Sequence, residues 1–360
     1  MCCHDLNRRD FVAVAAAGAL APVSAPAWDA DLWDPERPFA TLGKPLKVQP
    51  VLMYSLPKRR EAASWKSWGG IQTEEAVAEE MKRIAGELKA VAARAEFPVE
   101  VLPVVKVTSV EEGARARNPN ADVTVVYPAT GSGGMLRACI PESGSAIVFV
   151  RHRSGPVYYW YEALSVRYLR TGRPQTAPAN PVEAPRLSVD DVVVDDRNEL
   201  VWRLRALFGA KNFLGAKVVA LGGAQGKYAP EAPRVARERF KLDIAEPTYD
   251  DLALRIRSAR NERARVALAE RWAARYLSMP QTRLETDRKF VVNAFLLYGI
   301  FKDLIRESGA AAFTINRCMG TILPMAETTA CLTLSLLNDE GIPAFCESDF
   351  VIVPAGILLR

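Results

Sequence analysis

Two carboxylates stand two residues apart near the C-terminal end of the sequence. Glu347 and Asp349 follow residues 343–346, a short apolar stretch that predicts a strand. Hard divalent cations bind oxygen ligands, and the end of a strand offers such ligands from a rigid support. The pair therefore indicates a metal site. The alternative is that Ser348 or Asp349 caps a following helix while Glu347 is simply exposed.

A glycine-rich loop follows the predicted strand 217–221. The loop 222–227 ends in Lys227 but lacks the spacing and the Ser or Thr of a phosphate-binding loop, so Gly223 indicates either a sugar contact or a plain turn. A second glycine-rich loop, 131–134, follows the strand 123–127. It could bring backbone N–H groups toward an anion or a hydroxyl, or it could form a tight turn.

Asn316 and Arg317 follow a third predicted strand, 311–315. Their side chains can hydrogen-bond hydroxyl groups, although Asn is also an ordinary turn residue. Ligands of open α/β sheets bind beyond the carboxyl ends of the strands. We therefore expect Gly223, Asn316 and Arg317 to bind the substrate.

Thiols and imidazoles are scarce in this chain. It has six cysteines, none in a Cys-x-x-Cys pair, and two histidines, His4 and His152. His152 is more readily interpreted as a surface or hydrogen-bonded core residue than as a ligand. The remaining thiols of interest are Cys139, Cys318, Cys331 and Cys346, and spacing does not decide whether any two of them pair.

The C-terminal stretch resembles the L-fucose isomerase-like family, relatives of the arabinose isomerases. The resemblance lies in Cys318-Met319-Gly320, a helix from Thr328, the turn Gly341-Ile342-Pro343 and the strand end Cys346-Glu347-Ser348-Asp349. It implies that Glu347 coordinates a divalent metal, usually manganese, and takes part in proton transfer. It also implies aldose–ketose isomerisation of an open-chain sugar, with Asp349 either binding metal or orienting Glu347, and an assembly of several subunits.

The sequence departs from that family in one respect. Members bring a second carboxylate after the glutamate and a histidine from a C-terminal, largely β domain, and neither has a counterpart before Arg360. We therefore expect the C-terminal β domain to be missing and the chain, as a fragment, to be inactive alone.

The elements that carry these loops follow an α/β pattern. Short β-branched strands alternate with helical stretches, which is typical of Rossmann-like, doubly wound domains with mostly parallel sheets. We predict a lead segment over 28–45, a first α/β domain over 46–170, a proline-rich linker over 171–186 and a second α/β domain over 187–360. A helix is expected over 157–169, where the first domain ends.

The N-terminus has the features of an export signal. Arg8 and Arg9 precede Phe11 and a weakly apolar run, and the segment ends in Ala25-Pro26-Ala27. Residues 1–27 thus resemble a bacterial twin-arginine signal peptide, and we expect recognition by the twin-arginine export machinery, cleavage after Ala27 and a periplasmic location. An amphipathic helix is the alternative, but 11–20 has no polar residue for a second face.

Composition excludes several classes of protein. The chain has 360 residues, of which 49% are hydrophobic and 25% charged, as in a globular protein, and its net charge of +5 is spread without a basic block. We therefore expect no nucleic-acid partner. The apolar run 12–23 is too short to span a membrane, so we expect no integral membrane protein.

Three functions remain open. The first is a metal-dependent sugar isomerase that works through an ene-diolate, with Glu347 as its catalytic residue. The second is a periplasmic carbohydrate-binding or sensing protein that kept the scaffold without turnover. The third is a thiol or redox protein that uses Cys318, Cys331 and Cys346.

Overall fold

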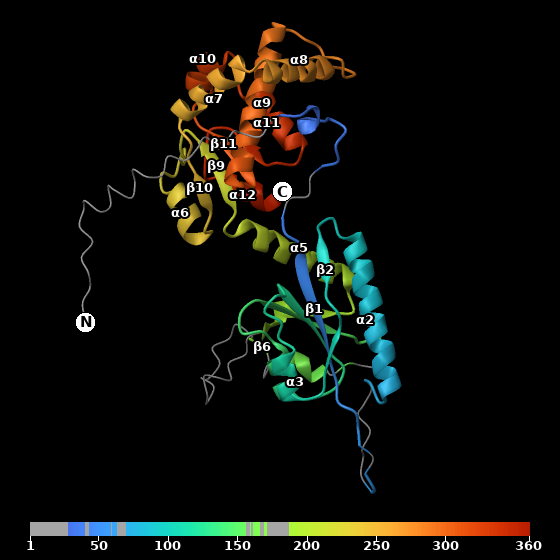
Figure 1. Cartoon of the computed structure of the whole chain (residues 1–360). Coiled ribbons are helices and arrows are strands. Elements are labelled where there is room, and N and C mark those ends of the chain that lie inside the picture. The colour runs from blue at the N-terminus through green and yellow to red at the C-terminus, as the bar shows by residue number, and fades with distance from the viewer. Residues whose placement is uncertain are drawn as a thin grey trace, which may run out of the picture. The chain divides into compact units, whose positions relative to one another are not determined.

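The computed structural model describes residues 28–360 apart from 40–42, 59, 63–69, 156–158, 160, 166–168 and 171–186. The chain divides into two compact units, each with its own parallel sheet (Figure 1). The first sheet unit comprises Ala40–Ala216, Arg234–Leu242 and Pro354–Arg360. The second sheet unit comprises residues up to Phe39, Lys217–Pro233 and Asp243–Val353.

The first sheet is built around β1, which has β2 and β3 on one side and β4 on the other. Its order is β2-β1-β4-β5-β8, and β3 also pairs with β1. Every pairing is parallel. The strands are β1 (Leu46–Met53), β2 (Val99–Val101), β3 (Val105–Val107), β4 (Val123–Pro128), β5 (Ser145–Val150) and β8 (Val192–Val194).

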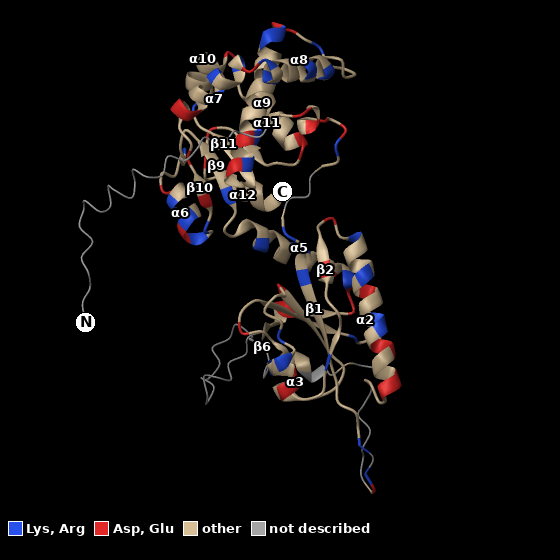
Figure 2. Cartoon of the chain, in the orientation of Figure 1, with Lys and Arg blue, Asp and Glu red and all other residues tan. Residues whose placement is uncertain are grey.

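Helices connect these strands, as parallel pairing requires. They are α2 (Glu74–Arg94), α3 (Val110–Arg115), α4 (Gly133–Cys139) and α5 (Arg197–Phe213), and α12 (Val353–Leu359) ends the chain. The long helix α2 begins at Thr73, whose hydroxyl accepts a hydrogen bond from the N–H of Ala76 at 3.2 Å. Acidic and basic residues are mixed along the ribbon of α2 (Figure 2), while Ile84 and Leu88 are buried.

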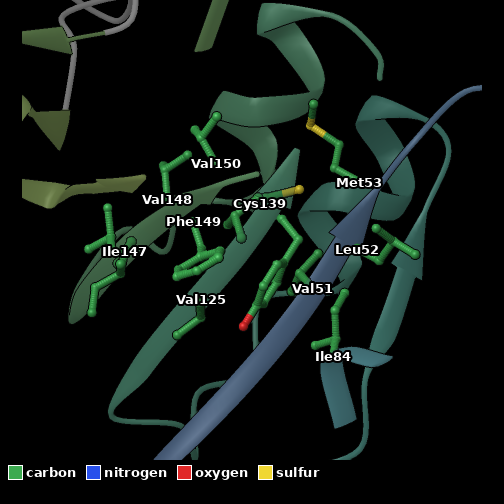
Figure 3. Packing of buried hydrophobic residues seen from close by; sticks show 14 of the residues in the cluster. Val51, Leu52, Met53, Ile84, Val125, Cys139, Ile147, Val148, Phe149 and Val150 are labelled. Atoms are coloured by element: carbon green, nitrogen blue, oxygen red, sulfur yellow. The ribbon is translucent and has the colours of Figure 1, made fainter. Parts of the chain in front are cut away.

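The core of the first sheet unit lies between the sheet and these helices. Val51, Val125 and Phe149 come from the neighbouring strands β1, β4 and β5, and Ile84 of α2 and Cys139 of α4 pack in the same cluster (Figure 3). The three strands read as nearly continuous apolar runs because both faces of a parallel sheet are covered. Cys139 is thus a buried apolar side chain, and burial raises the pKa of its thiol to about 12.

The second sheet has the order β10-β9-β11-β12, again with parallel pairings only. Its strands are β9 (Lys217–Leu221), β10 (Asp243–Ala245), β11 (Ala312–Ile315) and β12 (Ala344–Phe345). Its helical elements are η1 (Ala30–Leu32), α7 (Tyr249–Asn261), α8 (Arg263–Leu277), α9 (Arg288–Ser308), the π-helical turn η5 (Cys318–Ile322), α10 (Leu323–Ala326) and α11 (Cys331–Asp339). The helix α6 (Ala232–Arg239) follows β9 in the chain.

The α/β class with mostly parallel sheets, predicted from the sequence, is confirmed. The domain borders differ from those predicted. The strand β8 and the helix α5 follow the proline-rich segment, yet β8 pairs with β5 and α5 packs on β1, so both belong to the first sheet unit. The change between units comes at Lys217 and not at 171–186, a segment that lies outside the described residues.

One local prediction also differs from the structure. In place of a helix over 157–169, the described residues form a 3-10 turn, η2 (Tyr161–Leu164), and a short strand, β6 (Leu169–Arg170), which pairs with β7 (Leu187–Ser188). The strands β2 and β3 are separate, with Pro103 between them, and a proline has no N–H to donate to a ladder.

The predicted signal peptide, residues 1–27 with Arg8 and Arg9, lies outside the described residues. Among those described, no single helix has the length and apolarity that a membrane crossing needs. The segments Cys318–Ala326 and Cys331–Asp339 meet that requirement only when taken together, and they are bent by 95° relative to each other.

Candidate functional site at the carboxyl edge of the second sheet

The loops that follow β9, β11 and β12 meet at one edge of the second sheet, because parallel strands end on the same side. Glu347 lies two residues beyond β12, with an exposed side chain and a φ of 71°. Its backbone carbonyl accepts a hydrogen bond from the Gln225 side chain at 2.6 Å. Its carboxylate forms no hydrogen bond or ion pair with the described part of the chain. This carboxylate is therefore available to a ligand.

Asp349 has a different environment. It is 7% exposed, and its Oδ1 accepts hydrogen bonds from the backbone N–H groups of Lys227 and Val351, both at 3.2 Å. The backbones of Gln225 and Asp349 also form an isolated parallel bridge. Asp349 thus ties the loop after β9 to the loop after β12 and starts the turn that follows. A role for its second oxygen in metal binding stays a prediction.

The two glycines after β9 differ in their surroundings. A Cβ at Gly222 would lie 2.4 Å from the ring carbons of Tyr249, and the φ of Gly222 is +79°. Gly223 has a φ of +98° and nothing within 4 Å of the position of a Cβ. Only at Gly222 does the absence of a side chain let another residue, Tyr249, lie directly against the backbone.

Asn316 and Arg317 follow β11 at the same edge. The Asn316 N–H donates to the Leu221 carbonyl at 2.9 Å, and its side-chain amide donates to the Gly222 carbonyl at 3.5 Å. Arg317 is left-handed, with a φ of 48°, and its side chain is exposed. The strand β11 ends at Ile315, just before these two residues. The guanidinium of Arg317 forms no hydrogen bond or ion pair with the residues that the structure describes, so it is available to an anionic or hydroxyl group.

Three side-chain oxygens at this edge have no hydrogen-bond partner among the described residues, although each is buried. They are Tyr249 Oη, Asn316 Oδ1 and Ser348 Oγ. Asn316 is 9% exposed and Ser348 0%. A buried polar group without a partner costs about 1–3 kcal/mol, so such groups usually meet water or a ligand. Together they can donate to and accept from hydroxyl groups.

The electrostatics of the edge keep the Tyr249 phenol neutral. Burial raises its pKa to about 12; the charges of Cys318, Glu347 and Cys346 also raise it, whereas Arg317 opposes them. Tyr249 is thus a hydrogen-bond donor at neutral pH. The same interactions show that Tyr249, Arg317, Cys318 and Glu347 lie close enough to influence one another.

The described residues do not fit a complete manganese site. Within the part of the chain that the structure describes, no three His, Cys, Asp or Glu side chains are grouped so that they could hold a metal ion. Glu347 is an available oxygen ligand, while one oxygen of Asp349 is engaged by two N–H groups. His152 belongs to the first sheet unit.

All five predicted site residues, Gly223, Asn316, Arg317, Glu347 and Asp349, lie in the three strand-end loops of this edge. Tyr249 was not predicted. It is the first residue of α7, three residues beyond the Glu246 that follows β10. Ligands of open α/β sheets bind beyond the carboxyl ends of the strands. Recognition of the short strand β10 in the sequence would therefore have made Tyr249 a candidate as well.

Comparison with known proteins adds no family to this picture, because no protein-family model matches the chain and no curated protein is significantly similar to it.

Proposed function

We propose that the carboxyl edge of the second sheet binds an open-chain sugar and that Glu347 moves a proton on it, as in an aldose–ketose isomerase. The observation that carries the proposal is the set of three buried, unpartnered oxygens beside one exposed, unpaired carboxylate. A sugar offers vicinal hydroxyls that donate and accept, which is what Tyr249, Asn316 and Ser348 need. An apolar ligand would leave all three unsatisfied.

The reaction follows from the position of these groups. Glu347 removes the proton on C2 of the aldose, the C–H electron pair forms the C1–C2 double bond, and the carbonyl pair moves onto O1. Return of the proton to C1, with transfer of the O2 hydrogen to O1, gives the ketose without an oxidant or reductant. The Tyr249 hydroxyl and the Arg317 guanidinium are the donors available to the developing negative charge.

The family resemblance implies manganese for such a reaction and assembly into oligomers. Export to the periplasm is proposed separately, from the resemblance of residues 1–27 to a twin-arginine signal peptide. Because the described residues do not form a ligand set around Glu347, no step of the proposed reaction is derived through a metal ion.

The test uses the full chain with pentoses and deoxyhexoses, with and without added manganese. The proposal predicts conversion of at least one sugar, in contrast to the inactivity that the family resemblance implies for a fragment, and Glu347→Gln should lower turnover by about 10²-fold or more, since the amide cannot accept the proton. Product is measured by chromatography and sugar affinity by calorimetry. Unchanged turnover in Glu347→Gln would remove the role assigned to that residue.

The variant Tyr249→Phe tests the contribution of the Tyr249 hydroxyl to sugar binding without disturbing folding. The Tyr249 hydroxyl has no partner to lose, so we expect the free energy of unfolding to change by less than about 0.5 kcal/mol. Sugar affinity should fall by about 5–10-fold, the value of one hydrogen bond. Tyr276→Phe is the matched control, because the Tyr276 ring packs against Trp33 and Phe295, and it should leave affinity unchanged.

Binding without conversion, with or without manganese, would favour the alternative of a carbohydrate-binding or sensing protein on the same scaffold. An affinity that Tyr249→Phe does not alter would contradict both functions at this edge.

A further inference from the structure

Three thiols gather next to this edge, and the proposed sugar chemistry uses none of them. Cys318 begins η5, Cys331 begins α11, and Cys346 follows β12. All three are free thiols, as is the distant Cys139. Cys318 is 2% exposed, whereas Cys331 and Cys346 are exposed. The fold thus brings one buried thiol and two accessible ones together from three separate elements.

Cys318 lies beside the start of α11. The Cys318 sulfur accepts a hydrogen bond from the N–H of Ala330 at 3.3 Å, which places it beside the residue that precedes Cys331. The Cys331 thiol also adds to the rise in the pKa of Cys318, after the larger effect of burial. Cys346 interacts with both only through its charge. The pair most directly placed to form a bond is therefore Cys318 with Cys331.

We propose that Cys318 and Cys331 form a dithiol that exchanges with disulfides and closes into an intramolecular disulfide. Cys331 is the entry point because it is exposed and stands at the first position of α11. The preceding residue, Ala330, offers no side-chain oxygen to cap that helix.

The exchange is balanced without a further reactant. The Cys331 thiolate attacks one sulfur of an external disulfide, a mixed disulfide forms, and the other sulfur leaves as a thiol after taking up a proton. The Cys318 sulfur then attacks Cys331, and the second external sulfur leaves as a thiol. Two protein thiols are oxidised and one external disulfide is reduced to two thiols.

Burial gives the second step a pH dependence. Desolvation raises the pKa of the Cys318 thiol, and the neighbouring charges of Cys331 and Glu347 add to the rise, while the Ala330 N–H opposes it. Because the thiolate is the attacking form, closure of the disulfide should accelerate as the pH is raised from 7 to 9. The resulting cross-link would lie directly after Asn316 and Arg317.

The test exposes the reduced full chain to mixtures of oxidised and reduced glutathione, alkylates the remaining thiols and maps them by mass spectrometry. Trypsin leaves all three cysteines in one peptide, because the sequence has no Lys or Arg between Arg317 and Arg360. Cleavage after glutamate separates them, at Glu327, Glu340 and Glu347. We expect Cys318 and Cys331 to be lost from the alkylated set together, as one linked pair of peptides.

Single variants decide between pairings. Cys346→Ser should form the same disulfide as the unchanged chain, and Cys139→Ser serves as the control for a buried thiol of the other unit. Cys331→Ser should protect Cys318 from oxidation. A Cys318–Cys346 or Cys331–Cys346 disulfide as the main product, or complete alkylation of both Cys318 and Cys331 at the most oxidising ratio, would overturn the proposal. Two results come from the unchanged chain: which cysteines are linked, and how completely Cys318 and Cys331 are alkylated. They decide the proposal even where a variant fails to fold.

Discussion

Arg151 lies directly after β5 with no exposed surface. Its guanidinium pairs with Glu80 and with Glu87, each at 2.7 Å, and stands over the rings of Tyr127, Phe149 and Tyr159 at 5.6–5.9 Å. Glu80 is 1% exposed and also accepts the hydroxyl hydrogen of Tyr159. A buried ion pair of this kind is costly to break from one side, because the remaining charge has no water to solvate it.

At the residue scale we therefore expect Arg151→Met to lower the free energy of unfolding by about 3–5 kcal/mol, since the buried Glu80 would lose its buried cation and keep only the half-exposed Arg83, at 3.2 Å. Urea unfolding followed by circular dichroism measures the change. Arg205→Met is the control: Arg205 and Glu96 pair at 2.7 Å on the surface, where a pair contributes about 0–1 kcal/mol. Equal losses in the two variants would show that the buried network is not what stabilises the first sheet unit.

The loop between β9 and α6 is positioned by its contacts with the loop after β12 and with the first residue of α7. The Gln225 N–H donates to the Ser348 carbonyl at 3.1 Å, and the Gln225 carbonyl accepts from the Phe350 N–H at 2.8 Å, so that Gln225 lies opposite Asp349 in a parallel bridge. The Tyr249 ring lies against Gly222. These contacts fix the position of the loop between β9 and α6, and they fix the position of Tyr249 as well.

At the element scale, alanine substitutions at the adjacent residues Gly222 and Gly223 can be compared directly. Both have positive φ values, so either change to alanine carries a backbone cost of roughly 1–2 kcal/mol. Gly222→Ala must also displace the Tyr249 ring, which we expect to cost about 1–3 kcal/mol more. It should weaken sugar binding as well, whereas Gly223→Ala should not reach Tyr249. Unfolding curves and calorimetry on both variants check this, and equal effects would contradict it.

The segment after the predicted cleavage site is part of the core of the second sheet unit. Trp28 is 7% exposed, and its indole N–H donates to Asp303 at 2.8 Å across 275 residues of sequence. Its ring lies against Gly299, where a Cβ would be 2.5 Å from it, and 4.6 Å from the Arg265 guanidinium. Trp33 packs edge-on against Phe295 at 4.7 Å. These residues are therefore core residues, although the sequence suggested only a lead segment.

At the scale of the whole molecule we expect Trp28→Ala to lower the free energy of unfolding by about 3–5 kcal/mol, through lost burial and through the loss of the indole hydrogen bond to Asp303. Trp202→Ala is the control, since Trp202 is 63% exposed and its loss should matter by less than about 0.5 kcal/mol. Thermal and urea unfolding measure both. If Trp28→Ala were as stable as Trp202→Ala, the packing of Trp28 would not contribute to the stability of the second sheet unit.

Local patterns were sufficient for much of the fold. The boundaries of β4, β9 and β11 agree closely with the apolar runs 123–127, 217–221 and 311–315, a pattern that depends only on neighbours in the chain. Short strands such as β8 and β10 escaped recognition because three residues carry too little pattern. Their strand conformation comes from pairing with β5 and β9.

The sequence by itself determined that the chain is α/β, and it located Gly223, Asn316, Arg317, Glu347 and Asp349 after strands. Parallel strands end at one edge, so local information was enough to group those residues. Only the tertiary structure decided that Tyr249 and the thiols of Cys318 and Cys331 join them, that Asp349 is engaged by backbone N–H groups, and that Trp28 is a core residue. Those facts depend on contacts between residues far apart in sequence, which no local pattern encodes.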